Sequence, residues 1–358
     1  MTAASFQHDA AAVTRVAQRI AQAQEAIATT RFDEAMGLLR TLLVETADLP
    51  EQHFDVLLAR CTWHYYQPET AAAIEWGQRA VEHAQANLTP AHEARARALL
   101  ANVKDLAGDI DGALAEATRA LTLLPRAEGA TQARAYAAIS HVAQRAGEES
   151  LCFDMLRRAI DAAAGHDVLR SSILLVMAAA QTRFALERWW ARTLDAEAAV
   201  QARVSVVAGT ELNAVLGTGT NHGRGLIAEG EALLAQDRFD EALDRLERGI
   251  AEVQDQGAAE LADAISLRAY CLARLGRVDQ ALALAQQARL RILDAGQRDP
   301  ELRLVVLRSV AEVMRLAVHP QAELARVEWM EAQRELERFR SRIRARLGEP
   351  LLQFGAQP

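Results

Sequence analysis

The groups with which this sequence could do chemistry are few, and their spacing matches no catalytic motif. Cys61, Cys152 and Cys271 lie far apart and form no CxxC pair, so they indicate neither a zinc ribbon nor a disulfide framework. His64 and His141 are single histidines on expected helices, where packing and surface roles are the usual ones. HExxH and GxSxG are absent, so neither a zinc protease helix nor a nucleophile elbow is indicated. The sequence therefore predicts a protein that is not an enzyme and that needs no metal or cofactor.

A stretch rich in Gly and Thr at residues 205–225, SVVAGTELNAVLGTGTNHGRG, is the remaining candidate for chemistry. A Gly-rich loop can cradle a phosphate through its bare backbone N–H groups. A P-loop requires GxxxxGKS or GxxxxGKT, and the sequence contains neither. We interpret residues 205–225 as an irregular break or loop between blocks of helices, with phosphate binding as the lesser alternative.

The overall composition favours helix and excludes several classes of partner. Leu and Ala dominate, and aromatic residues make up 5% of the chain. The net charge of −8 argues against a general binder of nucleic acid or of anionic membranes. The N-terminus lacks the pattern of a signal peptide, and the longest apolar run, at 173–180, is too short to span a bilayer. We expect a soluble cytoplasmic protein, and the single lysine, Lys104, suggests a GC-rich bacterial genome.

A repeat in the sequence predicts the helices that must position any binding residues. The motif RFDEA occurs at 31–35 and again at 238–242, and looser copies occur elsewhere in the chain. Each copy has a short polar turn, then a small residue, then a helical stripe of apolar and small residues. The small residues are Ala35, Ala73, Ala113, Cys152, Ala242 and Ala281. Their spacing is about 40 residues, with one gap of about 90 that should contain a degenerate repeat.

A second small position lies twelve residues before each of these. These upstream positions are Ala23, Cys61, Ala101, Ser140, Gly230 and Ala269. Two small positions at a fixed offset indicate a pair of closely packed antiparallel helices in each repeat. Asp33, Asp109, Asp240 and Asp279 lie where a carboxylate is stabilised by the free N–H groups and dipole of a helix N-terminus.

This pattern resembles the tetratricopeptide repeat (TPR) family over about residues 13–320. The family's small residue in its first helix matches Gly230 and Ala101, and the alanine of its second helix matches Ala35 and Ala242. The family's proline after the second helix matches only at Pro125. The spacing exceeds the usual repeat length of roughly 34 residues. It looks more like the longer helices in the sensor portion of maltose-regulator-like activators. The resemblance implies an all-α solenoid of stacked antiparallel helix hairpins in a right-handed superhelix.

The resemblance also implies a concave groove, lined by the first helix of each hairpin, that binds peptides or partner helices. The family's groove pattern picks out Thr62, Tyr65, Arg95, Asn102, Arg134, His141, Arg145, Glu231 and Tyr270. Asn102 fits the family's use of Asn to hold a ligand's backbone. Arg95, Arg134 and Arg145 favour an acidic segment or a C-terminal carboxylate. The alternative for each of these side chains is simple solvation.

The degenerate repeat is expected within residues 167–204. The segment SSILLVMAAAQTRFAL reads as its first helix and ERWWARTLDAEAAVQARV as its second. Trp189 and Trp190 stand out in a chain with so few aromatic residues. We interpret them as a plug of the core, with an exposed anchor for a partner as the lesser alternative.

The C-terminal part reads as one charged helix. Trp329, Leu336 and Ile343 are seven residues apart, and Ala332 and Phe339 continue a second apolar line. A lid on the last repeat is the first interpretation, and a dimerising coiled coil is the second. The arginines near its end are Arg338, Arg340, Arg342, Arg344 and Arg346, which we interpret as a solvated face rather than a nucleic-acid contact. We expect repeat blocks at 13–204 and 226–320, the break at 205–225 and the capping or coiled-coil helix at 321–347.

Three functions remain open at this stage. The first is a non-catalytic scaffold or adaptor that binds a protein or peptide segment in its groove, without nucleic acid or membrane as a partner. The second is the sensory or regulatory module of a bacterial signalling protein, for example one that controls a cyclic-dinucleotide synthase or a transcription regulator. The third is an enzyme with an unrecognised site, for which the sequence offers no cluster of ionisable groups.

Overall fold

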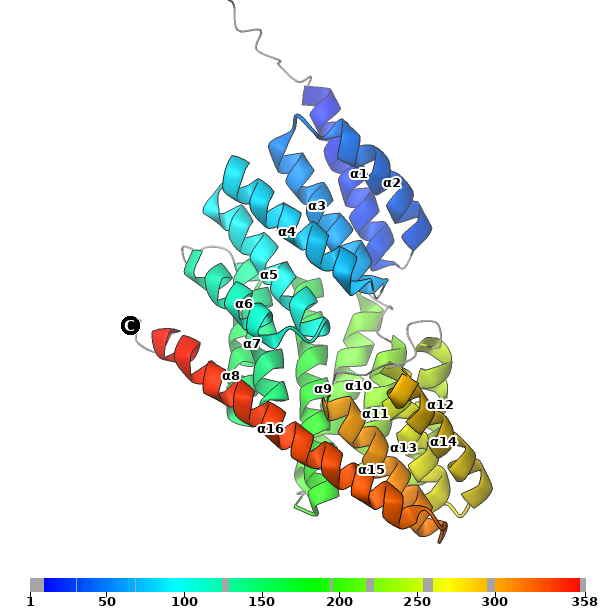
Figure 1. The fold of residues 1–358 in the computed structure, drawn as a ribbon. Coiled ribbons are helices and arrows are strands. Elements are labelled where there is room, and N and C mark those ends of the chain that lie inside the picture. Colours follow the sequence, from blue (N-terminus) through cyan, green and yellow to red (C-terminus); the bar gives the residue numbers. More distant parts are fainter. Residues whose placement is uncertain are drawn as a thin grey trace, which may run out of the picture. The chain divides into compact units, whose positions relative to one another are not determined.

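The computed structural model describes residues 10–354 except 30, 68, 124–128, 194–195, 217–221, 254–259 and 295–299. These residues form helices and contain no strand (Figure 1). The helices are α1 (Ala10–Ala28), α2 (Phe32–Glu45), α3 (Pro50–Tyr66), α4 (Thr70–Asn87), α5 (Pro90–Leu106), α6 (Ile110–Leu123), α7 (Gly129–Arg145), α8 (Glu149–Ala162), α9 (Asp167–Ala191), α10 (Ala196–Val215), α11 (His222–Leu234), α12 (Phe239–Val253), α13 (Glu260–Arg274), α14 (Val278–Asp294), α15 (Pro300–Leu316) and α16 (Ala322–Phe354). None of the described helices combines the length and the hydropathy that a bilayer crossing requires.

Successive helices pack as hairpins. Helix α1 packs on α2, α3 on α4, α5 on α6, α9 on α10, α11 on α12, α13 on α14 and α15 on α16. The odd-numbered helices also contact one another. Helix α1 contacts α3, and α3 contacts α5. Further along the chain, α9 contacts α11, α11 contacts α13, and α13 contacts α15. The odd-numbered helices are thus the first helices of the repeats. The predicted all-α solenoid of antiparallel helix hairpins is confirmed.

The small positions of the repeat lie where the two helices of a hairpin meet. The twelve positions are buried: Ala23, Ala35, Cys61, Ala73, Ala101, Ala113, Ser140, Cys152, Gly230, Ala242, Ala269 and Ala281. A Cβ atom added at Gly230 would lie 2.8 Å from Cγ of Leu246 on the facing helix. A larger side chain at such a position would push the two helices apart, which explains the twelve-residue offset.

Acidic residues lie at the starts of several helices. The two RFDEA motifs begin α2 and α12, with Asp33 and Asp240 in the first turn, and Asp279 holds the same place in α14. Asp109 instead caps α6, because its Oδ1 accepts a hydrogen bond of 3.0 Å from the backbone N–H of Gly112. These carboxylates lie near unpaired N–H groups and the positive end of the helix dipole. Pro125, the proline that matches the TPR pattern, lies outside the described residues.

The degenerate hairpin is present between the regular repeats, but its boundary differs from the expected one. Helix α9 continues through the ERWW segment to Ala191, and the next helix begins only at Ala196. Arg192 ends α9 with a φ of 57°, in the left-handed region. The segment contains no glycine or proline that would break the helix earlier, and Trp189 and Trp190 pack against the core from the last turns of α9.

The expected irregular break at 205–225 is wrong for its described residues. Helix α10 covers the stretch up to Val215, and α11 begins at His222, while 217–221 lie outside the described residues. The glycines serve close helix packing instead of a phosphate loop. A Cβ at Gly209 would lie 3.4 Å from the backbone of Leu175 on α9, and one at Gly223 would lie 2.8 Å from Cβ of Glu252 on α12.

The chain divides into two compact units, unit 1 (Met1–Ala138) and unit 2 (Ile139–Pro358). The division falls within α7, not at residues 205–225, where α9, α10 and α11 all pack on one another. Unit 1 has several small cores, for example the one that Leu39, Leu42 and Val56 build between α2 and α3. Unit 2 contains an extended core that runs from α9 to the start of α16.

Helix α16 is the longest helix of the chain's described part and packs on α15. Its apolar line faces inward: Ala332, Leu336 and Ile343 are buried, and Trp329 is half-buried against the core of unit 2. Since this line is buried within its own unit, it is not free to form the seam of a dimer. The arrangement is the one that a capping helix requires.

Candidate functional site

In unit 1, the predicted groove residues lie on the odd-numbered helices. Thr62 and Tyr65 are on α3, Arg95 and Asn102 are on α5, and Arg134 is on α7. The repeat spacing places Arg95 and Arg134 at equivalent positions of successive repeats, each five residues after the start of its helix. The structure brings these two guanidinium groups together closely enough to influence each other's charge.

The environment of Arg134 disfavours its positive charge. Burial lowers the pKa of its guanidinium below the ordinary value, and the like charge of Arg95 lowers it further, while Tyr66 acts in the opposite direction. Arg95 is neutralised by Asp55, whose Oδ1 lies 2.8 Å from its Nη1. Within the described part of the chain, Arg134 has only a weak contact of 3.4 Å with the carbonyl of Ala130 and no carboxylate. A half-buried cation without a counter-charge would be stabilised by an anionic group.

Asn102 is half-buried on α5, and its amide oxygen is an orphan. The Oδ1 atom is shielded from solvent and has no hydrogen-bond partner among the described residues. A buried amide oxygen without a partner costs free energy, which a donor from a ligand would recover. Asn102 and Arg134 therefore leave one acceptor and one cation unused on neighbouring odd-numbered helices.

Thr62 and Tyr65 have structural partners in unit 1. The hydroxyl of Thr62 donates to the carbonyl of Leu58 in its own helix, and Tyr65 packs beside the core. Tyr66, which the groove pattern did not select, forms an edge-to-face pair with Tyr65 and exposes 46% of its surface. The Tyr65–Tyr66 pair in a chain with few aromatic residues was the signal that could have identified it.

In unit 2, the predicted groove residue Tyr270 is part of the core. It is 4% exposed and its ring lies against Trp189, Trp190 and Phe239, with ring centroids 5.0–6.1 Å apart. Its hydroxyl accepts a hydrogen bond of 2.9 Å from Arg274, while burial raises its pKa. The expectation that Tyr270 faces a partner is therefore wrong for this structure. The interpretation of Trp189 and Trp190 as a core plug is confirmed by the same cluster.

His141 and Arg145 lie half-buried on α7 and interact with neighbouring groups of the chain. Both share α7 with Arg134 but lie beyond the division of the chain after Ala138, so they are assigned to unit 2, as are Glu231 and Tyr270. Within unit 2, Glu231 and Tyr270 do not share a site: Tyr270 belongs to the aromatic cluster, and Glu231 belongs to an ionic one.

Glu231 is part of a buried ionic cluster on α9, α11 and α13. Nη2 of Arg183 lies 3.3 Å from Oδ2 of Asp263 and 3.7 Å from Oε1 of Glu231, and both carboxylates are more than nine-tenths buried. Burial raises the pKa of Glu231 to about 7; Arg183 opposes this shift, and the like charge of Asp263 adds to it. Burial alone would lower the pKa of Arg183, but the carboxylates around it, Glu301 included, hold it above its ordinary value.

A second arginine joins the C-terminal helix to this region. Nη2 of Arg340 on α16 lies 2.6 Å from Oε1 of Glu187 and 3.0 Å from Oε1 of Glu301. Sequence reasoning missed Arg183, Asp263 and Arg340. A helical pattern assigns such polar residues to a solvated face, and it gives no signal that another helix will cover them.

A test of the ionic cluster is the pH dependence of stability. A carboxyl whose pKa is raised from 4.5 to about 7 on folding stabilises the fold when it is protonated, and this contribution is lost as the pH rises through that window. We expect Glu231→Gln to gain stability relative to the wild type by on the order of 2 kcal/mol between pH 5 and pH 8. Urea denaturation at the two pH values measures this difference. An equal difference at both values would contradict the raised pKa.

The described groups offer little for covalent chemistry. Burial raises the pKa of Cys61, Cys152 and Cys271 to about 12, so these thiols are protonated at neutral pH and are weak nucleophiles. Among the described residues, no group of three or more His, Cys, Asp or Glu side chains could hold a metal ion. The arrangements that do stand out are sites for ion pairing and hydrogen bonding.

Comparison with known proteins agrees with the fold. No protein-family model matches the chain, and no curated protein matches it. The crystal structure of a Rap protein complexed with competence and sporulation factor is 13% identical, with a TM-score of 0.58 over 96% of this chain and 99% of that chain. RapI in its apo form is 9% identical, with a TM-score of 0.48 over 93% and 98%. The TPR2AB domain of yeast Sti1 in its pHSP90 complex is 15% identical, with a TM-score of 0.29 over 89% and 99%. At 13% identity, the similarity to the Rap protein is one of fold, that of a helical repeat solenoid.

Proposed function

We propose that this protein is a non-catalytic interaction scaffold that binds a peptide or protein segment along the odd-numbered helices of unit 1. The observation that carries the proposal is Arg134, a half-buried guanidinium beside Arg95 without a carboxylate of its own among the described residues. A ligand carboxylate, from an acidic side chain or a C-terminus, would supply the missing charge.

Asn102 would hold the backbone of the ligand. Its amide NH2 can donate to a peptide carbonyl, and its Oδ1, which is buried in the described conformation, could accept a hydrogen bond from a peptide N–H after rotation of the side chain. Backbone hydrogen bonds are independent of the ligand's side chains, so Asn102 supplies affinity while the arginines select an anionic group. Tyr66 would add apolar contact beside Arg134, since aromatic side chains and Arg are enriched at such interfaces.

The proposal predicts a loss of binding when both unused groups are removed. A peptide array would first supply sequences that bind the full chain, each made with a free C-terminus and as a C-terminal amide. We expect Asn102→Ala/Arg134→Ala to weaken binding of these peptides by roughly a hundredfold, because a charge-assisted pair and a backbone hydrogen bond are lost. Fluorescence anisotropy with labelled peptides measures the change.

Asn87→Ala/Arg119→Ala is the matched control. It removes the same residue types from exposed positions on α4 and α6, which are even-numbered helices of the same unit. This control should bind as the wild type does. Equal binding by the folded Asn102→Ala/Arg134→Ala variant would place the ligand elsewhere on the chain, and loss of binding by both variants would show that the effect is unspecific.

A second candidate is a sensory or regulatory module of a signalling protein. The solved complex between a Rap protein and competence and sporulation factor favours it, because that chain has the same fold over almost its whole length. The longer repeats also resemble the sensor portion of maltose-regulator-like activators. In that case peptide binding would change the affinity of this chain for a further protein, whereas a simple scaffold would bind both independently.

A further inference from the structure

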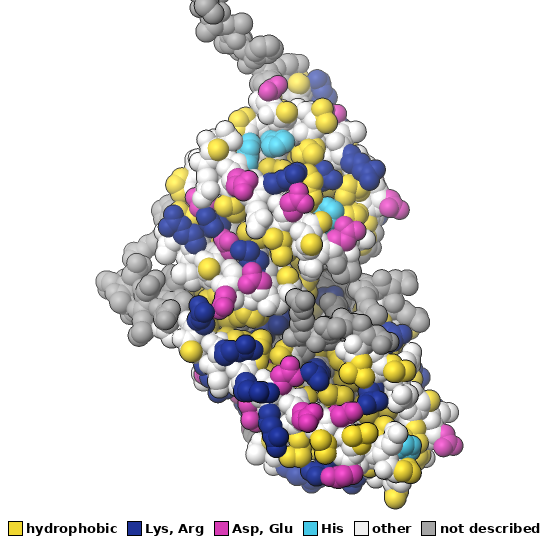
Figure 2. Space-filling model, viewed as in Figure 1, with side chains coloured by type: hydrophobic (Ala, Val, Ile, Leu, Met, Phe, Trp, Pro, Cys, Tyr) yellow, Lys and Arg dark blue, Asp and Glu magenta, His cyan; other side chains and the backbone are white. Residues whose placement is uncertain are grey.

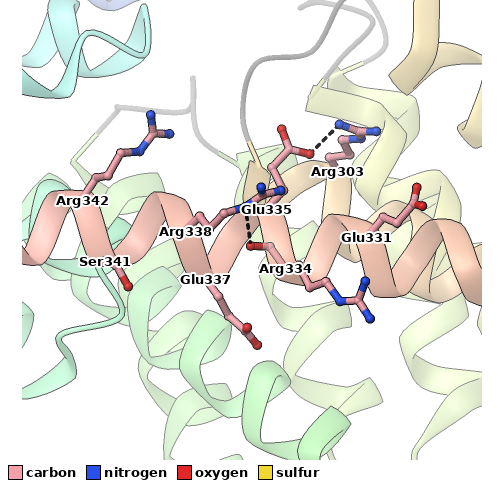
Figure 3. Close-up of a pocket in the computed structure, with 8 residues that line it drawn as sticks. All are labelled: Arg303, Glu331, Arg334, Glu335, Glu337, Arg338, Ser341 and Arg342. Atoms are coloured by element: carbon pink, nitrogen blue, oxygen red, sulfur yellow. Dashed lines mark hydrogen bonds and ion pairs between the residues drawn. The ribbon is translucent and has the colours of Figure 1, made fainter.

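Three arginines form a line on the exposed side of α16. Arg334, Arg338 and Arg342 follow one another at four-residue steps, so they lie on the same face of the helix and span about 12 Å along its axis. Figure 3 shows them along the helix, with Glu335 and Glu337 between them. The buried residues of α16, such as Leu336 and Ile343, lie on the opposite face. We call these three residues the arginine stripe.

The arginine stripe differs from the other arginines of α16 in its partners. Arg326 pairs with Glu323, Arg340 with Glu187 and Glu301, and Arg344 with Glu148. By contrast, Arg334, Arg338 and Arg342 form no ion pair with any described residue, and Arg338 only donates to the carbonyl of Arg334 in its own helix. The stripe is therefore a set of unpaired charges in a chain whose net charge is −8.

The local sequence offers acidic neighbours to Arg334, which has Glu331 and Glu337 three positions away, but none to Arg342. The residues three and four positions from Arg342 are Arg338, Phe339, Ala345 and Arg346. The acidic neighbour of Arg338, Glu335, is held by Arg303 at 2.6 Å. Like charges one helical turn apart destabilise a helix, so helix stability does not explain the pair Arg338 and Arg342.

The stripe borders a large open hollow. Its volume is 1260 Å³, and its described lining comes from α15 and α16: Arg303, Glu331, Arg334, Glu335, Glu337, Arg338, Ser341 and Arg342. A volume at or above that of typical ligand pockets can hold a segment of polypeptide. The space-filling view shows a row of basic side chains over α16, with acidic ones beside it (Figure 2).

We propose that the arginine stripe docks an acidic helical segment of a partner protein, with carboxylates one turn apart facing Arg334, Arg338 and Arg342. Arg pairs with carboxylates through two parallel hydrogen bonds, and a partner helix repeats its side chains at the same spacing as α16. The acidic residues Glu331 and Glu337 at the rim repel a uniform phosphate backbone. They suit a polypeptide that carries both charges, which favours a protein segment over nucleic acid.

The stripe is held in place from behind, so docking needs little ordering of α16. Arg340 anchors the helix to α9 and α15, and Arg344 donates to the carbonyl of Ala146 at 2.9 Å. Trp329 packs against the core of unit 2 nearer the start of α16. A preorganised helix loses less entropy on binding than a mobile one. This surface belongs to unit 2 and is independent of the peptide site proposed on unit 1.

The test uses the full chain and a labelled helical peptide with glutamate at positions i, i+4 and i+8. A second peptide with glutamine at these positions is its control. We expect the glutamate peptide to bind, and Arg334→Gln/Arg338→Gln/Arg342→Gln to weaken its binding by roughly tenfold or more. Binding should also weaken as ionic strength rises. Fluorescence anisotropy at low and at physiological ionic strength measures both effects.

Arg157→Gln/Arg248→Gln/Arg315→Gln is the matched control variant. It removes the same charge from unit 2, at side chains that are 67%, 53% and 62% exposed. It should bind the glutamate peptide within about twofold of the wild type, because none of its three arginines lines the hollow. The thermal midpoint of the stripe variant should not fall, because its charges are unpaired and mutually repulsive.

Three results would overturn the proposal. The wild type could fail to bind the glutamate peptide, or the stripe variant could bind it as tightly as the wild type. A single-stranded oligonucleotide could bind more tightly than the peptide and lose this binding in the stripe variant, which would assign the stripe to nucleic acid. A glutamate-dependent affinity that only the stripe variant loses supports the docking of an acidic segment.

Discussion

Replacing Arg183 by methionine is expected to lower the free energy of unfolding by about 3–5 kcal/mol. The guanidinium is the cation between two carboxylates, Asp263 at 3.3 Å and Glu231 at 3.7 Å. These carboxylates are only 6% and 5% exposed, so solvent cannot replace the lost charge. A buried charge whose partner is removed costs far more than an exposed one. Urea denaturation followed by circular dichroism measures the loss.

The rescue variant separates lost charge balance from lost packing. Arg183→Met/Glu231→Gln/Asp263→Asn removes the cation together with both carboxyl groups, and at pH 8, above the raised pKa of Glu231, it should recover most of the stability that Arg183→Met loses. Methionine keeps much of the volume of the arginine stem, so the cavity term is small in both variants. A single variant as stable as the wild type would mean that Arg183 does not neutralise the cluster.

The second large effect is expected at Gly249 on α12. A Cβ there would lie 2.8 Å from the carbonyl oxygen of Gly223 and 3.0 Å from the backbone nitrogen of Ile227, both on α11. Backbone atoms cannot rotate away as a side-chain end can, so the two helices would have to separate. We expect Gly249→Val to lower the free energy of unfolding by about 3 kcal/mol, at the upper end for overpacking. Chemical denaturation of the full chain measures it.

Gly37 on α2 is the matched control, since it occupies an exposed helical position with nothing within 4 Å of an added Cβ. Gly37→Ala should stabilise the chain by about 0.5–1 kcal/mol, because alanine favours the helix more than glycine does. The two substitutions therefore have opposite signs. If both substitutions lowered the free energy of unfolding, the loss at Gly249 could not be assigned to the contact between α11 and α12.

The repeat architecture could be predicted because its determinants recur. A small residue at the helix contact, such as Ala35 or Ala242, is required in every hairpin, and the same spacing therefore appears several times in one sequence. The hairpin between the regular repeats was located in the same way. Its turn was misplaced because the sequence contains no glycine or proline at Arg192, where an arginine adopts the left-handed conformation.

The candidate site was predicted less well, because a position on a helix does not reveal what covers it. Arg95 and Arg134 were selected by their repeat positions, and the structure does bring them together. Glu231 and Tyr270 were selected in the same way, yet both are buried. Tyr270 lies in an aromatic cluster and Glu231 in an ionic cluster. Both clusters are built from residues far apart in the chain, so no local sequence pattern could predict these clusters. The binding role of each groove residue remains a prediction.

The length of α16 changes how unit 2 should fold. In an open array of repeats each hairpin contacts only its neighbours, and the terminal hairpin is free to fray. Helix α16 has 33 residues, about 50 Å of helix, and its Arg344 reaches the carbonyl of Ala146, 198 residues earlier in the chain. Loss of the last helix would therefore also break contacts at the turn before α8. Unit 2 is closed on itself by these distant contacts, so it should unfold as one cooperative body and fold more slowly than an open stack of the same hairpins.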